Sequence, residues 1–383
     1  MALSAVNIFN KLIEWPHRGA GSEDEMMARE VLTTELVGEP GVEVAEEGLR
    51  APATYLPFFW MVAIGQATAI MLAIWFPYVA FLAGAVFLGS HLLFFDWRVS
   101  PLVWLGPKRL TANLVAKKGE GRRLFILMAH LDSAPASYAY RADQVKHFAV
   151  SVYIGTAIVA FGAIIPLFDV SGVTIPIWLR GLLVIAILSQ PIIAAMDFWR
   201  FGYTPGANDN LSGVAAATAT ASKLWRHMPE DAEVRLVITS AEEAGMLGAQ
   251  HYWRAHEDEL KARQTHVLNF DTVGNKNLKY VCLSGGFTPV RYEGPLIEAA
   301  ESLCKQGPHF SNIKAGAHHV GDFDSVWFVR DGISSLTIAS YDDENLMPHI
   351  HTPQDTSQHV DMEQIVRSAL FGEAIIRLLP VDK

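Results

Sequence analysis

Four stretches of the chain are almost free of charged side chains, and each is about as long as a membrane-spanning helix. They cover residues 55–76, 77–95, 147–168 and 173–198. About 20 apolar residues in a helix cross the ~30 Å hydrocarbon layer of a bilayer, whereas a buried helix of a soluble protein is usually shorter and keeps one polar face. Pro77 lies at the junction of the first pair, and a short segment, 169–176, joins the second. The pattern therefore predicts two transmembrane hairpins with four helices.

The remaining sequence alternates short apolar runs with helical patterns. Ser22 and Glu25 have the spacing of a capping box at the start of the first helical pattern. Strands alternating with helices are typical of a layered α/β fold, and the hairpins interrupt this pattern as insertions would. The expected strands are 42–45, 112–116, 124–128, 234–239, 266–270 and 335–339, and the expected helices are 22–36, 213–226, 248–262, 295–305 and 362–379.

These patterns divide the chain into one α/β domain and two insertions. We expect residues 1–54, 98–146 and 200–383 to form the α/β domain. The first transmembrane hairpin then occupies residues 55–97, and the second occupies residues 147–199.

Charge and composition exclude several classes of protein. The chain has 30 Lys and Arg against 40 Asp and Glu, and no basic stripe interleaved with aromatic residues, which argues against nucleic acid as a partner. Two cysteines cannot form a disulfide framework. The first residues lack the basic and then apolar pattern of a signal peptide.

The cations that flank the apolar blocks predict the orientation of the chain. Because each hairpin returns to the side that it left, everything outside the hairpins lies on one face of the membrane. Only Arg180 belongs to the opposite face. By the positive-inside rule we expect a multi-pass membrane protein whose α/β domain and both termini are cytosolic. The cations on the domain side are Arg50, Arg98, Lys108, Arg109, Arg141, Lys146 and Arg200.

Polar residues follow three of the expected strands, at the point where each strand ends. These are His130 with Asp132, the Glu242-Glu243 pair, and Asp271. Ligands bind beyond the carboxyl ends of strands in open α/β sheets, so these side chains are expected to converge. A buried carboxylate needs a cation or hydrogen-bond donors, and imidazole together with carboxylate suits zinc. Two loop-like segments, 206–213 and 349–355, add further polar residues.

Taken together and in this order, five segments resemble the co-catalytic di-zinc aminopeptidases of peptidase family M28. They are the HxD segment 130–132, the GANDN segment 206–210, the Glu242-Glu243 pair, the Asn-Phe-Asp strand end 269–271 and the HTPQD segment 351–355. The resemblance covers nearly all of the sequence outside the apolar blocks. It implies a mixed-sheet, three-layer α/β fold and a zinc-dependent aminopeptidase with two zinc ions per chain.

The resemblance also implies a role for each site residue. Asp209 would bridge the two zinc ions, with His130 and Asp271 completing one site and Glu243 and His351 the other. Glu242 would be the general base, beside the attacking water without ligating a metal. Asp132 would accept the second N–H of His130 and so orient its ring.

The sequence departs from the family at three places. Both hairpins lie between segments that relatives join more directly, and the second separates His130 from Asp209. The segment 323–325 reads Phe-Asp-Ser where many relatives have Ser-Asp-His. Ile350 precedes His351, where some members have a tyrosine that stabilises the oxyanion; Tyr341 is near in sequence.

Because the second hairpin is tethered closely to the site residues, we expect a preference for hydrophobic or membrane-associated peptides. One alternative is hydrolysis of N-acyl amino acid or aminoacyl-lipid amides. Another is glutaminyl cyclisation, disfavoured because the cyclases lack the first His of the set. A third is a catalytically silent membrane scaffold, disfavoured because all five ligands and the base are present.

Overall fold

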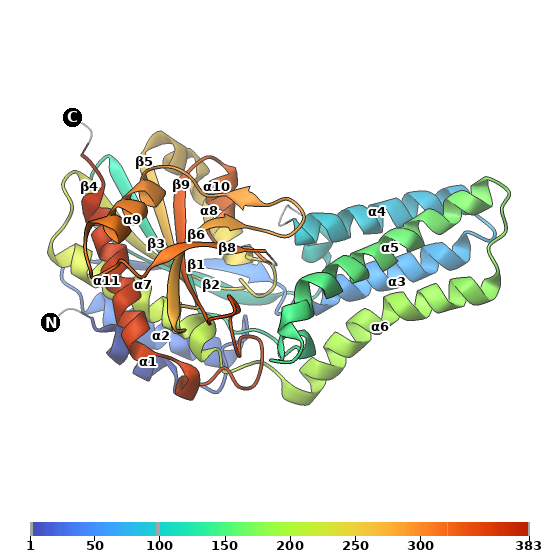
Figure 1. The fold of residues 1–383 in the computed structure, drawn as a ribbon, viewed down its shortest axis with the longest axis horizontal. Coiled ribbons are helices and arrows are strands. Elements are labelled where there is room, and N and C mark those ends of the chain that lie inside the picture. The colour runs from blue at the N-terminus through green and yellow to red at the C-terminus, as the bar shows by residue number, and fades with distance from the viewer. Residues whose placement is uncertain (1–2, 97–99, 320, 382–383) are drawn as a thin grey trace.

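The computed structural model describes residues 3–96, 100–319 and 321–381. A mixed β-sheet with helices on both faces makes up the α/β part of the chain, and four long helices project from one side of it (Figure 1). The expected α/β fold with a mixed sheet in three layers is therefore confirmed.

The sheet has a parallel centre and antiparallel edges, in the order β1-β2-β4-β3-β5-β9-β6-β7, with β8 paired to β6. Strands β4, β3, β5 and β9 run parallel, so their carboxyl ends lie along one edge. The strands are β1 (Glu43–Ala51), β2 (Arg109–Lys118), β3 (Arg123–His130), β4 (Ala232–Thr239), β5 (Gln264–Asp271), β6 (Asn277–Ser284), β7 (Val290–Arg291), β8 (Lys314–His318) and β9 (Ser334–Tyr341).

The central strands are buried on both faces, which explains their continuous apolar sequence. In β3, Phe125 and Leu127 pack into the larger core, while Leu124 and Ile126 pack into the smaller one. Helices α1 (Ala5–Leu12), α2 (Glu23–Val37), α7 (Gly213–Arg226), α9 (Pro295–Gln306) and α11 (Met362–Leu378) cover the larger core. Helices α8 (Leu247–Ala262) and α10 (Val326–Arg330) cover the smaller one.

Every strand and helix expected for this part of the chain is present, and the first helix begins as predicted. The Ser22 hydroxyl accepts a hydrogen bond from the Glu25 N–H at 3.1 Å. The Glu25 carboxylate, however, accepts from the Gly21 N–H rather than from that of Ser22. The expectation of a single helix before β1 was wrong, since α1 precedes α2; strands β6, β7 and β8 and helix α10 were also missed.

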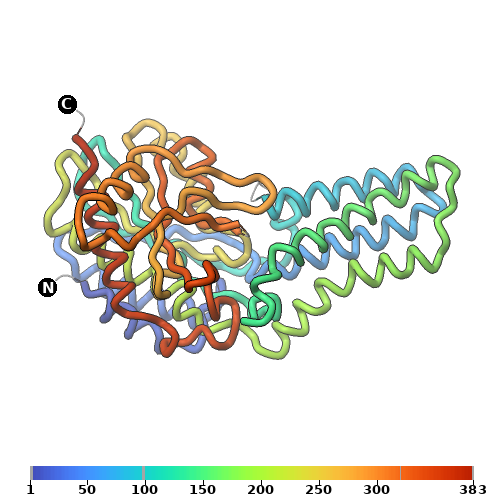
Figure 2. The backbone as a smooth tube through the Cα atoms, viewed as in Figure 1, coloured from blue at the N-terminus to red at the C-terminus, as the bar shows by residue number. Residues whose placement is uncertain are grey.

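The four projecting helices pair as two hairpins and lie side by side (Figure 2). They are α3 (Leu56–Leu72), α4 (Pro77–Phe95), α5 (Phe148–Val170) and α6 (Ile177–Phe201). Among the described residues, three helical segments are long and apolar enough to cross a membrane: Pro77–Phe95, Val145–Val170 and Ile177–Phe201. The fourth, α3, is apolar but has only 17 residues.

Polar side chains inside the helix bundle are bonded to neighbouring helices. The Gln66 amide donates to the Val159 carbonyl oxygen at 2.8 Å, and His91 Nε2 lies 3.0 Å from the Thr156 hydroxyl. At the far end, the buried Arg180 guanidinium pairs with Asp169. Of the flanking cations, Arg98 lies outside the described residues.

Candidate metal centre

Five chain segments bring the five predicted ligands and the predicted base to the carboxyl edge of the parallel strands, and the seventh predicted residue, Asp132, follows His130 by two positions. His130 ends β3, Asp271 ends β5, and the Glu242-Glu243 pair lies in the turn after β4. Asp209 lies in the kinked segment Ala207–Ser212 that leads into α7, where its own backbone is not helical, and His351 lies in the loop after β9. Residues that are far apart in sequence thus meet where the topology places the strand ends.

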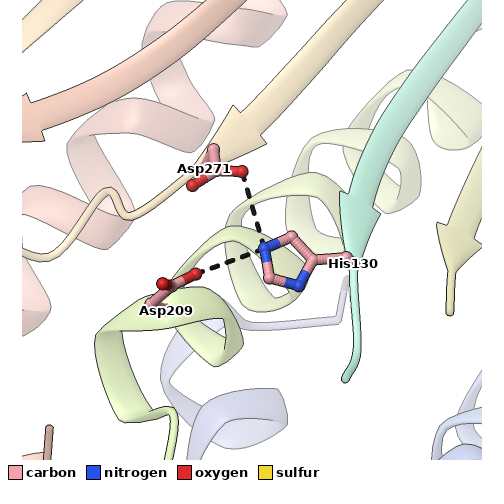
Figure 3. A group of neighbouring side chains, drawn as sticks. All are labelled: His130, Asp209 and Asp271. Carbon is pink, nitrogen blue, oxygen red and sulfur yellow. Dashed lines mark ion pairs between the residues drawn. The ribbon is translucent and has the colours of Figure 1, made fainter. Parts of the chain in front are cut away.

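One group of ligating atoms surrounds the His130 ring. Its Nε2 lies 3.2 Å from Asp209 Oδ1 and 3.6 Å from Asp271 Oδ2. Figure 3 shows both carboxylates turned toward this nitrogen, each from a different element. All three side chains are buried.

A second group surrounds the His351 ring and shares Asp209 with the first. His351 Nε2 lies 3.1 Å from Asp209 Oδ2 and 3.3 Å from Glu243 Oε2. The two oxygens of Asp209 therefore face two different imidazoles. Glu242 stands beside both groups, with its Oε2 4.0 Å from His130 Nε2.

Burial and mutual repulsion perturb the protonation of these carboxylates. Burial raises the pKa of Glu243 well above its ordinary value, and the neighbouring Asp209 and Glu242 add to the rise. Burial likewise raises the pKa of Glu242 well above its ordinary value, against the opposing effect of His130. Burial alone would raise the pKa of Asp209, but hydrogen bonds from His130 and His351 hold it below its usual range. So many carboxylates in one buried site require positive charge.

The donor set fits zinc. Each group offers imidazole and carboxylate atoms within 4.8 Å of one another, and Asp209 belongs to both. Glu243 Oε1 is buried and has no hydrogen-bond partner among the described residues. Mixed nitrogen and oxygen donors of this kind are typical of zinc sites.

Asp132 holds the Glu242-Glu243 turn rather than mainly orienting the His130 ring. Its two carboxylate oxygens accept the backbone N–H groups of Glu242 and Glu243 at 3.0 and 3.1 Å. His130 Nδ1 lies 3.8 Å from the Asp132 carboxylate and only 3.0 Å from its backbone carbonyl oxygen. Asp132 therefore contacts the ring chiefly through its main chain.

Asp355, the last residue of the HTPQD segment, holds the backbone of Asp209 in the same manner. Its carboxylate accepts the N–H groups of Asn208 and Asp209 at 2.8 and 3.1 Å. Asn210 ties this segment to β5, because its amide donates to the Phe270 carbonyl oxygen at 3.0 Å. The segment that carries Asp209 is thus fixed from two sides.

Arg18, which was not predicted as a site residue, joins the end of β3 to the Asp209 segment. This buried guanidinium donates to the carbonyl oxygens of Leu131, Pro205 and Gly206 at 3.0, 2.8 and 2.7 Å. Gly206 has φ +63°, and a Cβ there would lie 2.7 Å from the Arg18 side chain, so the close approach requires glycine. A lone arginine in a loop carries no sequence signal of this role.

The backbone is also unusual beside the candidate ligands. Ala241, Thr272 and His351 have φ values of +58°, +51° and +54°, in the left-handed region that non-glycine residues seldom occupy. Ala241 precedes the Glu242-Glu243 pair and Thr272 follows Asp271, whereas His351 is itself a candidate ligand. Such positions gather at functional sites, where the surrounding structure holds them.

A cavity of about 1040 Å³ opens onto these side chains. Two phenols line it close to the candidate ligands: the Tyr140 ring lies 4.1 Å from the His351 ring, and the Tyr341 hydroxyl is buried without a partner among the described residues. Tyr140 was missed in the sequence because it belongs to a short segment between β3 and α5. Asp324, the carboxylate of the Phe-Asp-Ser segment, bonds to the Thr239 hydroxyl, and burial raises its pKa to about 7.

Sequence comparison relates the chain to known peptidases. Residues 192–374 match the profile of peptidase family M28. Aminopeptidase YwaD of Bacillus subtilis is 33% identical over 189 residues, which cover 47% of this chain and 39% of that protein. An aminopeptidase of Pseudomonas aeruginosa is 36% identical over 96 residues, covering 25% of this chain and 18% of that protein. The chain thus spans well under half the length of these relatives.

Solved structures share the fold at low sequence identity. A leucine aminopeptidase precursor from Bacteroides thetaiotaomicron has a TM-score of 0.59 at 14% identity, with 99% of each chain covered. A Zn-dependent exopeptidase from Parabacteroides distasonis has a TM-score of 0.57 at 15% identity, with 97% of each covered. A glutaminyl cyclase from Bacteroides thetaiotaomicron has a TM-score of 0.57 at 15% identity, with 99% of each covered. Residues 192–374 thus resemble peptidase family M28, and the solved structures show that the chain shares the fold of zinc exopeptidases and glutaminyl cyclases.

Proposed function

We propose that the protein is a membrane-embedded zinc aminopeptidase that removes N-terminal residues from hydrophobic or membrane-associated peptides. The observation that carries the proposal is the position of Asp209, whose two oxygens face His130 and His351 at 3.2 and 3.1 Å. Two zinc ions per chain would be held by His130, Asp209 and Asp271 on one side and by Asp209, Glu243 and His351 on the other. The arrangement supports Asp209 as the bridging ligand.

The residues around the proposed zinc pair have different roles in amide hydrolysis. Zinc supplies Lewis acidity for the substrate carbonyl and for the attacking water. Glu242 accepts a proton as the water oxygen bonds to the carbonyl carbon, and it returns a proton to the leaving amine as the C–N bond breaks. Asp132 keeps Glu242 and Glu243 in register by holding their backbone N–H groups. Glu242 lies close to the centre, in a third group with His130 and Glu243, and it does not belong to the two groups that contain Asp209.

The helix bundle supports the membrane part of the proposal. Helices α5 and α6 have 23 and 25 residues, or ~35–37 Å at ~1.5 Å per residue, which is enough to span the hydrocarbon layer. Exposed tryptophans stand at both ends of the bundle: Trp75 and Trp178 at the far end and Trp199 at the near end. Aromatic residues gather at membrane interfaces in this way.

The flanking charges support a cytosolic α/β domain. Arg180, the cation at the far end, is buried in its pair with Asp169, whereas Lys108, Arg109, Lys146 and Arg200 lie at the domain end. The apolar cavity would also accept an amino acid linked to a lipid by an amide, which is the second candidate substrate. A silent scaffold would need no ligand set of this kind.

Substitution of the base tests the mechanism. Glu242→Gln should lower kcat for an apolar dipeptide by ~10²–10⁴-fold and keep the bound zinc, because it removes a proton acceptor and no ligand. Glu243→Gln is the matched control and should lose zinc as well as activity. Full activity in Glu242→Gln would contradict the mechanism.

A further inference from the structure

The cavity that contains the candidate metal centre continues into the helix bundle. Beyond the candidate ligands its walls come from all four projecting helices. Phe59 lines it from α3, Phe95 from α4, Thr156 from α5 and Ala194 from α6. The site and the membrane-facing bundle therefore share one continuous space.

The bundle part of this space is deep and reaches the outer surface of the helices. Gln190 lines the cavity and lies ~16 Å along α6 from the end of that helix at ~1.5 Å per residue. Ser151 of α5 and Ile193 of α6 line the cavity and are also exposed, Ile193 by 53%. The seam between α5 and α6 is therefore where the cavity adjoins the surroundings of the bundle.

Two polar side chains deep in this apolar space have unused hydrogen-bonding atoms. Gln190 Nε2 and His91 Nδ1 are both buried, and neither has a partner among the described residues. His91 is held in place because its other ring nitrogen bonds to the Thr156 hydroxyl. Buried polar atoms are normally satisfied, so these two point to a ligand that supplies polar groups at this depth.

A peptide meets this requirement and a hydrocarbon tail does not. In a low-dielectric space every peptide N–H and C=O needs a partner, whereas an acyl chain offers none. At ~3.3 Å per residue, about five extended residues cover the ~16 Å to Gln190. The apolar walls suit the side chains of such a peptide.

We propose that the bundle part of the cavity is a subsite for the backbone of an apolar peptide, beyond the residue that is removed. The peptide enters between α5 and α6, and Gln190 and His91 hydrogen-bond to its peptide groups. This subsite rests on the proposed aminopeptidase function and assigns the substrate class to a peptide rather than to a lipid-linked amide.

The test uses zinc-loaded full-length protein in lipid nanodiscs. For each variant, kcat/KM is measured for leucine p-nitroanilide and for all-leucine peptides of two to six residues. In the wild type, kcat/KM relative to that for the anilide should be higher for the hexapeptide than for the dipeptide. Gln190→Leu should lower the hexapeptide-to-anilide ratio by about tenfold, the effect of one hydrogen bond. Ala194→Phe, which fills the cavity from the same helix, should lower it as well.

Ser189→Ala is the matched control, because Ser189 precedes Gln190 on α6 and bonds within its own helix to the Ala186 carbonyl oxygen. Its length dependence should equal that of the wild type. A wild-type series that is flat with peptide length, or a Gln190→Leu ratio equal to that of the wild type, would overturn the subsite while anilide hydrolysis upholds the proposed function. A flat peptide series together with rates that rise with acyl length for aminoacyl-lipid amides would assign the cavity to a lipid tail. Failure of the wild type to cleave the anilide and every peptide would contradict the proposed function and the subsite with it.

Discussion

At the scale of single residues, two carboxylates that are not predicted ligands hold the backbone of the segments that carry the candidate ligands. Asp355 accepts two N–H groups in the Asp209 segment, and Asp132 accepts two in the Glu242-Glu243 turn. A carboxylate that accepts two N–H groups fixes a turn without a regular secondary structure. The candidate ligands are thus positioned by further acidic residues. These residues add to the negative charge of the site, which a bound metal would balance.

Glu25 provides a residue-scale prediction about pH. It is buried, its carboxylate accepts from the Gly21 N–H and the Thr111 hydroxyl, and burial raises its pKa to about 7. Because the folded state favours the protonated form, the contribution of Glu25 to stability is complete below its unfolded pKa of ~4.5 and is lost as the pH rises to about 7.

Glu25→Gln should therefore gain stability relative to the wild type between pH 4.5 and 7.5, by at most about 3 kcal/mol at ~1.4 kcal/mol per pKa unit. Thermal unfolding at several pH values measures the difference. Glu23→Gln, on the exposed side of the same first turn, is the control and should follow the wild type. A Glu25→Gln difference that does not vary with pH would show that the carboxyl group is not perturbed in the folded state.

Four residues of the site, His130, Glu242, Glu243 and Asp271, were predictable because they follow expected strands, whereas Asp209 and His351 were predicted from the family order of the motifs. Arg18 and Tyr140 were not, because only the tertiary fold brings them to the site. The resemblance implied that the Asp132 carboxylate orients the His130 ring, but this carboxylate accepts the Glu242 and Glu243 N–H groups and lies 3.8 Å from the ring. Short sequence spacing does not decide which of several close partners a carboxylate contacts.

At the scale of secondary structure, the parallel strands and the loops that follow them form the frame of the site. Strands β3, β4 and β5 were evident in the sequence because a strand buried on both faces is rich in apolar residues. Strand β6 was missed because it mixes buried with partly exposed residues and includes Lys279, and β8 was missed because it has no buried residue and begins with Lys314.

The loop before α7 provides a prediction at this scale. Asp355→Asn replaces one acceptor oxygen by an NH₂ group, so the N–H groups of Asn208 and Asp209 cannot both be accepted. Loss of such a supporting contact should weaken zinc binding by ~10–100-fold. Competition with a chelator of known affinity measures the change.

Gln354→Ala is the control for this experiment, since Gln354 is the exposed neighbour of Asp355. It should bind zinc as the wild type does. Equal zinc affinity in Asp355→Asn and the wild type would show that the loop keeps its conformation without this carboxylate.

At the scale of the whole molecule, the two hairpins place the site next to the apolar bundle. The first hairpin separates β1 from β2, and the second separates β3 from the Asp209 segment. Both project from the same side of the α/β part, with their turns at the far end (Figure 1). Because the hairpins are inserted between strands and loops, the sheet stays intact, and the cavity lies between the α/β part and the four helices.

The paired hairpins lead to a prediction about topology. Met1, Lys118 and Lys383 should all face the cytosol, because each hairpin returns the chain to the side with more Lys and Arg. Single cysteines at these positions, in a chain whose two cysteines are replaced, should react with an impermeant reagent only after the cells are opened. Labelling at Lys118 in intact cells would show that the orientation is the opposite of the predicted one. Labelling that places the two termini on different sides of the membrane would contradict the two hairpins.

The two-zinc centre is tested most directly by adding zinc back to metal-free protein in nanodiscs while the release of leucine from an apolar peptide is followed. Activity should be absent without metal and should reach its plateau at two zinc ions per chain, because Asp209 faces two separate groups of ligands. Hydrolysis that persists in the metal-free protein, or a plateau reached at one zinc ion per chain, would contradict the two-zinc centre.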